Sequence, residues 1–126
     1  MRKEFARLQR AFANAWAGVR FLFENEPNAR IHLILAGAAS LLAWGLGFST
    51  TEWALLALTI GMVLVAEAMN TAMEALTDLV HPQRHPLAKA AKDVAAGGVL
   101  MAAFMAVIVA LFLFLPKLMA VFQEYV

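Results

Sequence analysis

The chain has 126 residues, of which 63% are hydrophobic, and its formal net charge at pH 7 is only +1. Its mean hydropathy is +0.72, and its apolar share exceeds the ~45–50% of ordinary soluble domains, which excludes a typical soluble protein. The absence of cysteine excludes disulfides and thiolate metal sites. Because charged residues interrupt everything before the first apolar run, no cleavable signal peptide is expected. We interpret residues 1–126 as one integral membrane domain.

The first predicted element is an amphipathic helix over residues 3–26. Large apolar side chains recur there at three- and four-residue spacing: Phe5, Leu8, Phe12, Trp16, Val19 and Phe23. Basic side chains lie between them: Arg2, Lys3, Arg7, Arg10 and Arg20. This pattern is typical of a helix that lies on a membrane surface, although a soluble helix that faces a core has the same pattern.

Three long apolar runs follow, and each predicts a membrane span. Leu33–Thr51 has no charge over 19 residues, close to the ~20 residues that cross a bilayer core. Trp53–Ala66 is also free of charge and begins a longer helix, and Val94–Pro116 gives 23 uncharged residues. The predicted spans are 31–50, 53–80 and 87–117.

The basic residues predict the orientation. The segment before His32 and the loop Leu79–Lys92 together hold nine of the ten Lys and Arg residues, whereas the Ser49–Glu52 turn holds none. By the positive-inside rule, the N-terminus and the second loop face the cytoplasm of a bacterial inner membrane. Pro82 and Pro86 are expected to break the long helix, and Pro86 can open the next one.

Glu67, Asn70, Glu74 and Asp78 form a polar stripe along the second predicted span. At about 100° per residue, they fall within an arc of about 80° on one helix face. A carboxylate in hydrocarbon costs about 2.5–3.5 kcal/mol on insertion scales, so an intramembrane acid indicates function. A rise of ~1.5 Å per residue places Glu67 about 21 Å below Trp53, just inside the cytoplasmic boundary of a ~30 Å core. The stripe therefore runs from lipid to water.

Soluble nucleotide-binding and zinc motifs are missing. The sequence has no G-x-x-x-x-G-K-[ST], and Gly45-x-Gly47 lacks the third glycine and a strand context. His32, His81 and His85 are more typical of interface or loop positions than of a zinc site. An acid-rich site without His and Cys favours a hard cation such as Mg²⁺, which binds through one or two carboxylates plus phosphates.

Lys89, Lys92 and Asp93 lie at the cytoplasmic start of the third predicted span. A helix N-terminus with lysines is a ready anion site. An exposed basic loop that obeys the positive-inside rule has the same composition, so this segment alone does not establish a phosphate site.

A longer pattern includes the stripe. It reads Glu67-x-x-Asn70-Thr71-Ala72-x-Glu74-x-x-x-Asp78 and continues with Ala91-Lys92-Asp93. Earlier segments of it are Trp16-x-Gly18-x-Arg20, Asn25-Glu26 and Arg30-Ile31-His32. Over about residues 5–117, the chain resembles the prokaryotic diacylglycerol kinase and undecaprenol kinase family. Two segments resemble the undecaprenol kinase branch more than the enterobacterial diacylglycerol kinase branch: Arg30-Ile31-His32 and His85-Pro86-Leu87-Ala88-Lys89.

This resemblance implies an all-α homotrimer of three-span protomers, each with an amphipathic surface helix, whose active sites are shared between neighbours. It implies transfer of phosphate from ATP, with Mg²⁺, to undecaprenol or diacylglycerol, and no nucleic acid partner. Glu67 would be the general base, supported by Asn70, while Glu26 and Glu74 would hold the metal. The implied nucleotide-binding residues are Arg7, Glu26, Glu74, Asp78, His85, Lys92 and Asp93. The implied lipid-binding residues are Trp16, Arg20 and Glu67.

One position departs from the family pattern. A tyrosine that is common near the nucleotide is Asn14 in this chain. The departure affects a contact with the nucleotide ring and leaves the residues expected for phosphate chemistry in place.

Two other classes of function fit parts of the sequence. A proton- or cation-conducting oligomer would use Glu67 as a relay, but the stripe leads into an acidic and lysine-bearing headgroup region, which argues against conduction. A structural adaptor would use the stripe as interhelical hydrogen-bonding groups. Small residues recur every fourth position in the third span, which favours close packing either between protomers or within one: Gly98, Ala102, Ala106 and Ala110.

Overall fold

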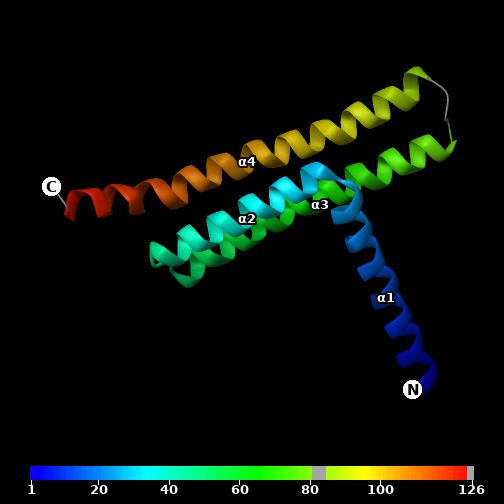
Figure 1. Cartoon of the computed structure of the whole chain (residues 1–126), viewed down its shortest axis with the longest axis horizontal. Helices are drawn as coiled ribbons and strands as arrows, with labels where there is room; N and C mark the ends of the chain where they lie inside the picture. Colours follow the sequence, from blue (N-terminus) through cyan, green and yellow to red (C-terminus); the bar gives the residue numbers. More distant parts are fainter. Residues whose placement is uncertain (81–84, 125–126) are drawn as a thin grey trace.

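The computed structural model describes residues 1–80 and 85–124, which form four α-helices joined by short connections (Figure 1). The helices are α1 (Arg2–Asn25), α2 (Pro27–Gly45), α3 (Thr50–Val80) and α4 (Pro86–Glu124). The sequence-based predictions on His81, Pro82 and Arg84 lie outside the described residues.

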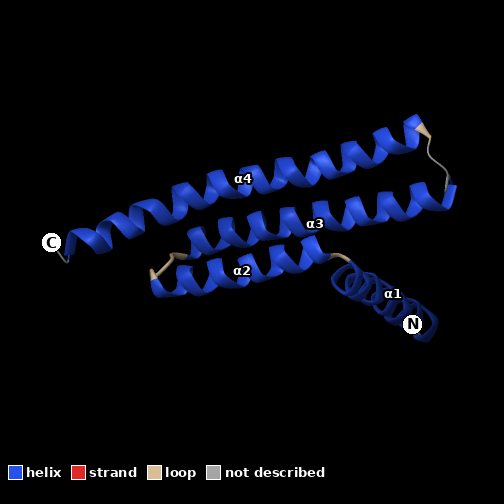
Figure 2. Ribbon diagram, turned by 45° about the horizontal axis from the view of Figure 1, so that its top comes forward, coloured by secondary structure: helices blue, strands red, loops and turns tan. Residues whose placement is uncertain are grey.

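Helices α2, α3 and α4 run side by side, while α1 projects from them as an arm (Figures 1 and 2). The most extensive packing joins α3 to α4, and α2 packs on α3. Helix α1 contacts α2 and α3 only slightly, and Leu22 near its end is its buried residue. The α3–α4 hairpin continues past the point where α1 leaves, which places the end of α3 and the start of α4 beyond the start of α2 (Figure 1).

Local chemistry sets the helix boundaries. Pro27 and Pro86 open α2 and α4, where the missing proline N–H costs no helical hydrogen bond. Glu26 links α1 to α2 in an extended conformation, with φ −104° and ψ 108°. Before α3, the Ser49 amide donates to Glu52 Oε2 at 2.6 Å, and the Glu52 amide donates to Ser49 Oγ at 3.3 Å. This reciprocal pair is a capping box that fixes the start of α3.

The turn between α2 and α3 is held against α4 by a compact apolar cluster. Its buried members are Ala43, Phe48, Leu56, Leu113 and Phe114. Lys117 on α4 adds polar contacts to the same turn: its Nζ lies 3.3 Å from Glu52 Oε2 and donates to the Gly47 carbonyl at 3.3 Å. Gly47 has φ +64°, a left-handed conformation that glycine adopts without the steric cost of a side chain.

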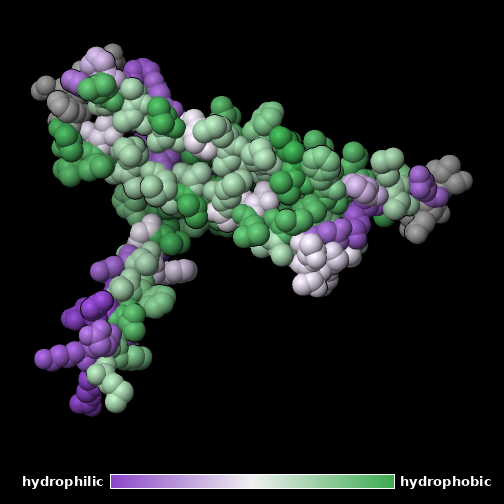
Figure 3. Space-filling view, turned by 180° about the vertical axis from the view of Figure 1, so that it is seen from behind, coloured by the Kyte–Doolittle hydropathy of each residue, from purple (hydrophilic) through white to green (hydrophobic). Residues whose placement is uncertain are grey.

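Most large apolar side chains outside this cluster are exposed. Figure 3 shows a hydrophobic surface over most of the bundle, with hydrophilic groups gathered at its ends and along one side of α1. Such extensive apolar exposure is unusual for a soluble monomer. Among the described residues, α3 and α4 have the length and apolar composition to cross a membrane, and α2 does not reach the same hydropathy.

The two long helices exceed a bilayer core. At ~1.5 Å per residue, the 31 residues of α3 span about 46 Å and the 39 residues of α4 about 58 Å. A hydrocarbon core is only ~30 Å thick. A helix of this length that crosses such a core extends beyond it into the headgroup region or water. The stripe from Glu67 to Asp78 lies toward the C-terminal end of α3.

Candidate active site

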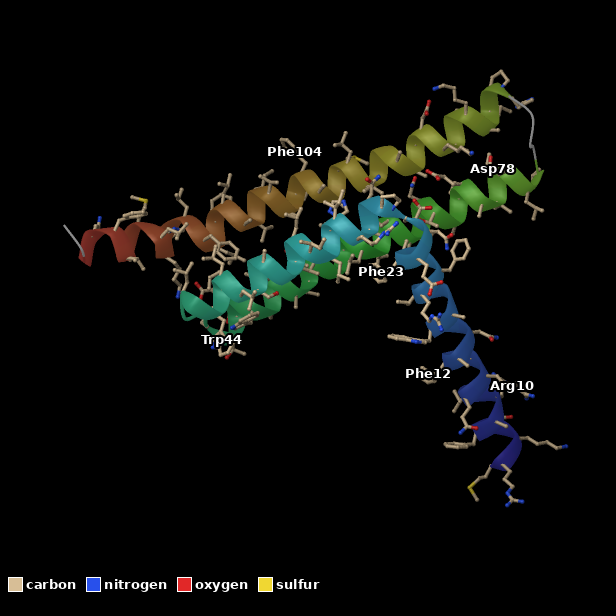
Figure 4. All side chains as sticks on the ribbon, viewed as in Figure 1. Arg10, Phe12, Phe23, Trp44, Asp78 and Phe104 are labelled. Atoms are coloured by element: carbon tan, nitrogen blue, oxygen red, sulfur yellow. The ribbon has the colours of Figure 1, made fainter. Side chains whose placement is uncertain are left out.

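The polar stripe of α3 passes from the buried interior to the exposed end of the helix. Glu67 is 2% exposed, Asn70 and Glu74 are partly buried, and Asp78 is exposed. Figure 4 shows Asp78 near the end of α3, where the helix faces the start of α4. The burial gradient follows the order of the four residues along the chain, and it places the most enclosed carboxylate deepest in the bundle.

The Glu67 side chain faces α2. His32 Nε2 lies 3.1 Å from Glu67 Oε1, and the two side chains are 23% and 3% exposed. Within the described part of the chain, Oε1 is buried and has no aligned hydrogen-bond donor. The neighbouring Thr71 hydroxyl donates to the Glu67 backbone carbonyl at 3.0 Å and leaves the carboxylate untouched. Glu67 therefore keeps acceptor capacity inside the bundle.

One helical turn further on, Asn70 orients Glu74. Asn70 Nδ2 donates to Glu74 Oε1 at 3.0 Å. The amide oxygen of Asn70 is buried, and no donor among the described residues reaches it. A buried acceptor of this kind costs free energy unless a ligand or another chain satisfies it.

Three carboxylates lie near one another at this level. Glu26 and Glu74 are both close enough to Glu67 to interact with it electrostatically. Glu26 comes from the α1–α2 link and the other two come from α3, so the folded chain gathers acids that are distant in sequence. Like charges repel one another, and a cation would relieve the repulsion.

A second polar group lies where the end of α3 meets the start of α4. Lys92 Nζ forms an ion pair with Asp78 across the two helices, and Lys89 pairs with Asp93 along α4. At the start of α4, the Leu87 amide donates to His85 Nδ1 at 3.2 Å. A pocket of about 320 Å³ opens beside them, lined by Leu76, Thr77, Val80, His85, Leu87 and Ala88. The folded chain thus brings together four of the expected nucleotide-binding residues.

The candidate residues on α1 do not join this group within one chain. Arg7 lies 3.8 Å from Glu4, Arg20 pairs with Glu24 at 2.9 Å, and Trp16 is 66% exposed. Figure 4 shows Arg10 on the part of the arm that leads away from the bundle, and Arg7 lies nearer still to its free end. Within one chain, these side chains are exposed on α1 and lie apart from the acids of α3.

His32 was not among the predicted site residues, although the structure places it against Glu67. A usable signal existed in the helix geometry. Starting from Pro27, five residues at ~1.5 Å each put His32 about 8 Å along α2, near the depth expected for Glu67. Similar depth alone does not show whether His32 faces α3, because that depends on how α2 packs on α3.

Long apolar helices, together with a polar stripe that becomes more exposed from Glu67 to Asp78, define a class of membrane protein with a polar site at one end of its helix bundle. The prokaryotic diacylglycerol kinase family matches residues 13–114. The chain belongs to this family and is a lipid kinase, a transferase of lipid metabolism.

Individual relatives extend this finding over most of the chain. An undecaprenol kinase of Bacillus subtilis is 38% identical over 117 residues, which cover 93% of this chain and 95% of the relative. A diacylglycerol kinase of Synechocystis is 45% identical over 87% of this chain, which spans 63% of that longer relative. A diacylglycerol kinase of Escherichia coli K12 is 31% identical over 82% of this chain and 85% of the relative.

Proposed function

We propose that this protein transfers the γ-phosphoryl group of ATP to the primary hydroxyl of a membrane lipid, undecaprenol or diacylglycerol, at the cytoplasmic face of a bacterial inner membrane. The observation that supports this most is the stripe from buried Glu67 to exposed Asp78. The stripe extends from the depth predicted for the lipid headgroup side of the membrane core to water. Family membership supports the reaction type.

Glu67 is the general base in this proposal. Its carboxylate accepts the proton of the lipid hydroxyl as the hydroxyl oxygen bonds to the γ-phosphorus. The bond between the γ-phosphorus and the bridging oxygen breaks, and ADP leaves with the bonding electrons. Phosphoryl transfer depends mainly on positioning and charge neutralisation. A single enclosed carboxylate that can still accept a hydrogen bond therefore suits the role of base.

The nucleotide would lie toward the water-exposed end of the stripe. Lys92 would exchange its ion pair with Asp78 for the phosphates, where charge-assisted hydrogen bonds are strong. Asp93, His85 and Asp78 lie around the same junction of α3 and α4. Asn70 would keep Glu74 in place through the hydrogen bond that the two side chains already make.

The carboxylates of Glu26 and Glu74 fit a magnesium ion. Among residues 1–80 and 85–124, no group of three or more His, Asp or Glu side chains surrounds one metal position. Mg²⁺ commonly takes only one or two protein carboxylates and completes its shell with phosphates and water, so these two glutamates would be enough to hold it. When bound, the ion would supply neutralisation of phosphate charge.

We propose that α2 is a third membrane span. Its 19 residues reach about 28 Å at ~1.5 Å per residue, and it lies alongside α3. Ile34, Leu41 and Trp44 on α2 are well exposed, as lipid-facing residues would be. With three spans, the basic arm and the α3–α4 connection both lie in the cytoplasm, as the positive-inside rule requires.

We also propose a homotrimer with shared sites. Within one chain, Arg7 and Arg20 pair with acids of α1 instead of the acids of α3, and Trp16 is exposed. No donor among the described residues reaches the buried amide oxygen of Asn70. A neighbouring chain would enclose the site and bring the candidate side chains of its own α1 to the acids. The small-residue stripe of α4 allows the close helix contact that such packing needs.

The lipid can be identified by direct comparison. Purified protein in mixed lipid should transfer labelled phosphate from ATP to undecaprenol and to diacylglycerol, and the ratio of the two kcat/KM values defines the substrate. Label in neither lipid would contradict the proposed function. A proton- or cation-conducting oligomer would instead give ion flux in vesicles without any lipid phosphate.

A further inference from the structure

His32 contacts the proposed base from a different helix. It lies in the second turn of α2, and its Nε2 atom is 3.1 Å from Oε1 of Glu67 on α3. The imidazole is mostly buried and the carboxylate is almost fully buried. Neither the spacing of the acid stripe nor the proposed metal and nucleotide roles explains why an imidazole occupies this position.

The Glu67 carboxylate needs a group that fixes its orientation. A glutamate has three side-chain torsions, and its last torsion is broad. Thr71 bonds only to the backbone of Glu67, and no aligned donor in the described chain reaches Oε1. Glu26 and Glu74, the other charged groups near it, are acids that repel the carboxylate. His32 is therefore the side chain in contact that can donate to it.

We propose that His32 is a positioning residue for Glu67. With its proton on Nε2, the imidazole donates to Oε1 once the site is assembled, and the other oxygen, Oε2, meets the lipid hydroxyl. A 3.1 Å contact needs only a small rotation to align, and catalytic hydrogen bonds are often poorly aligned before substrate binds. This inference rests on the proposed role of Glu67 as base.

The contact with His32 makes the orientation of Glu67 depend on a second helix. Since Glu67 is on α3, its orientation depends on the packing of α2 against α3 and on the tautomer that the imidazole adopts. The nitrogen that bears the proton in a neutral histidine is set by its hydrogen bonds. A base that is misplaced by about 1 Å can lose roughly 10²-fold in rate, so a modest contact can have a large kinetic effect.

The test compares two substitutions of His32 with a matched change elsewhere on α2. His32→Leu removes the donor and keeps a bulky side chain, whereas His32→Gln keeps an amide donor near the Nε2 position. Ser40→Ala is the control, because Ser40 donates only to Ala36 of its own helix, two turns away. We expect kcat to fall roughly 10- to 100-fold in His32→Leu, with KM for MgATP unchanged. His32→Gln should recover a large part of kcat, and Ser40→Ala should match the parent.

A double-mutant cycle separates positioning from general support of the fold. If His32 acts through Glu67, His32→Leu has little further effect on kcat in a Glu67→Gln background, because the group it positions is gone. A further loss as large as in the parent background, or equal losses in His32→Leu and His32→Gln, would overturn the inference. Parent-like kcat in His32→Leu would also overturn it. If Glu67→Gln itself turns over normally, the proposed base is wrong, which is a distinguishable result.

Discussion

At the scale of single residues, the site depends on how deeply each acid of α3 is buried. Glu67, Asn70, Glu74 and Asp78 were predictable from the sequence as a stripe, because helical periodicity alone places them on one face. The contact of Glu67 with His32 was not, since it depends on the rotation of α2 against α3. The ion pair of Asp78 with Lys92 was likewise not predictable, because it depends on the packing of α3 against α4.

The acids nearest to Glu67 give a prediction about metal dependence. Glu26→Ala and Glu74→Ala should each raise the Mg²⁺ concentration needed for half-maximal activity and weaken binding of MgATP, because each removes a carboxylate ligand. Rates measured over a Mg²⁺ titration at fixed ATP test this. Glu24→Ala is a matched control, since Glu24 is an exposed acid of the same region that pairs with Arg20. Titration curves that coincide with the parent for both variants would exclude these residues as ligands.

At the scale of helices, proline predicted one boundary correctly. Pro86 was expected to be able to open the last helix, and α4 does begin there. The capping box at the start of α3 was not among the predictions, although Ser49-x-x-Glu52 is its sequence pattern. The contact of Lys117 with the α2–α3 turn was not predicted either. Lys117 follows the 23-residue apolar run, so its partner could not be identified before the antiparallel packing of α3 and α4 was known.

Lys117 should therefore matter for stability and not for turnover. Lys117→Met keeps a side chain of similar length but removes three contacts of the ammonium: with Glu52, with the Gly47 carbonyl and with the Phe48 ring. Thermal unfolding in detergent should show a Tm lower by a few degrees, with kcat close to that of the parent. The loss should be smaller in a Glu52→Gln background, because the ion pair is already gone there, while the contacts with Gly47 and Phe48 still contribute. An additive loss in the double variant would show that Lys117 acts through other contacts.

At the scale of the whole molecule, a single chain leaves most of its apolar surface uncovered. It exposes large apolar residues along α2, α3 and α4 and holds α1 apart from the acids. Composition predicted a membrane protein because hydropathy is a property of the sequence. The packing of neighbouring chains depends on surface shape. We therefore propose the trimer and its shared sites from the family resemblance and from the buried Asn70 amide oxygen, which no donor among the described residues reaches.

Shared sites predict complementation between inactive chains. Glu26→Ala and Glu67→Ala protomers, each inactive alone, should regain part of the parental activity when they are mixed during assembly. Recovery follows because a composite site can take its intact glutamates from different chains. Re-association of each variant with itself is the control. No recovery in trimers shown to contain both chains, or full activity of a monomer in detergent, would argue against shared sites.

The most direct test of the central claim is the rate of phosphate transfer to lipid by Glu67→Gln. This substitution keeps the size of the side chain and its place beside His32 but removes the proton acceptor. With assembly verified, labelled ATP and the preferred lipid should give a kcat at least ~10²-fold below the parent, with MgATP binding retained. A kcat near that of the parent would contradict the assignment of Glu67 as the base of this lipid kinase.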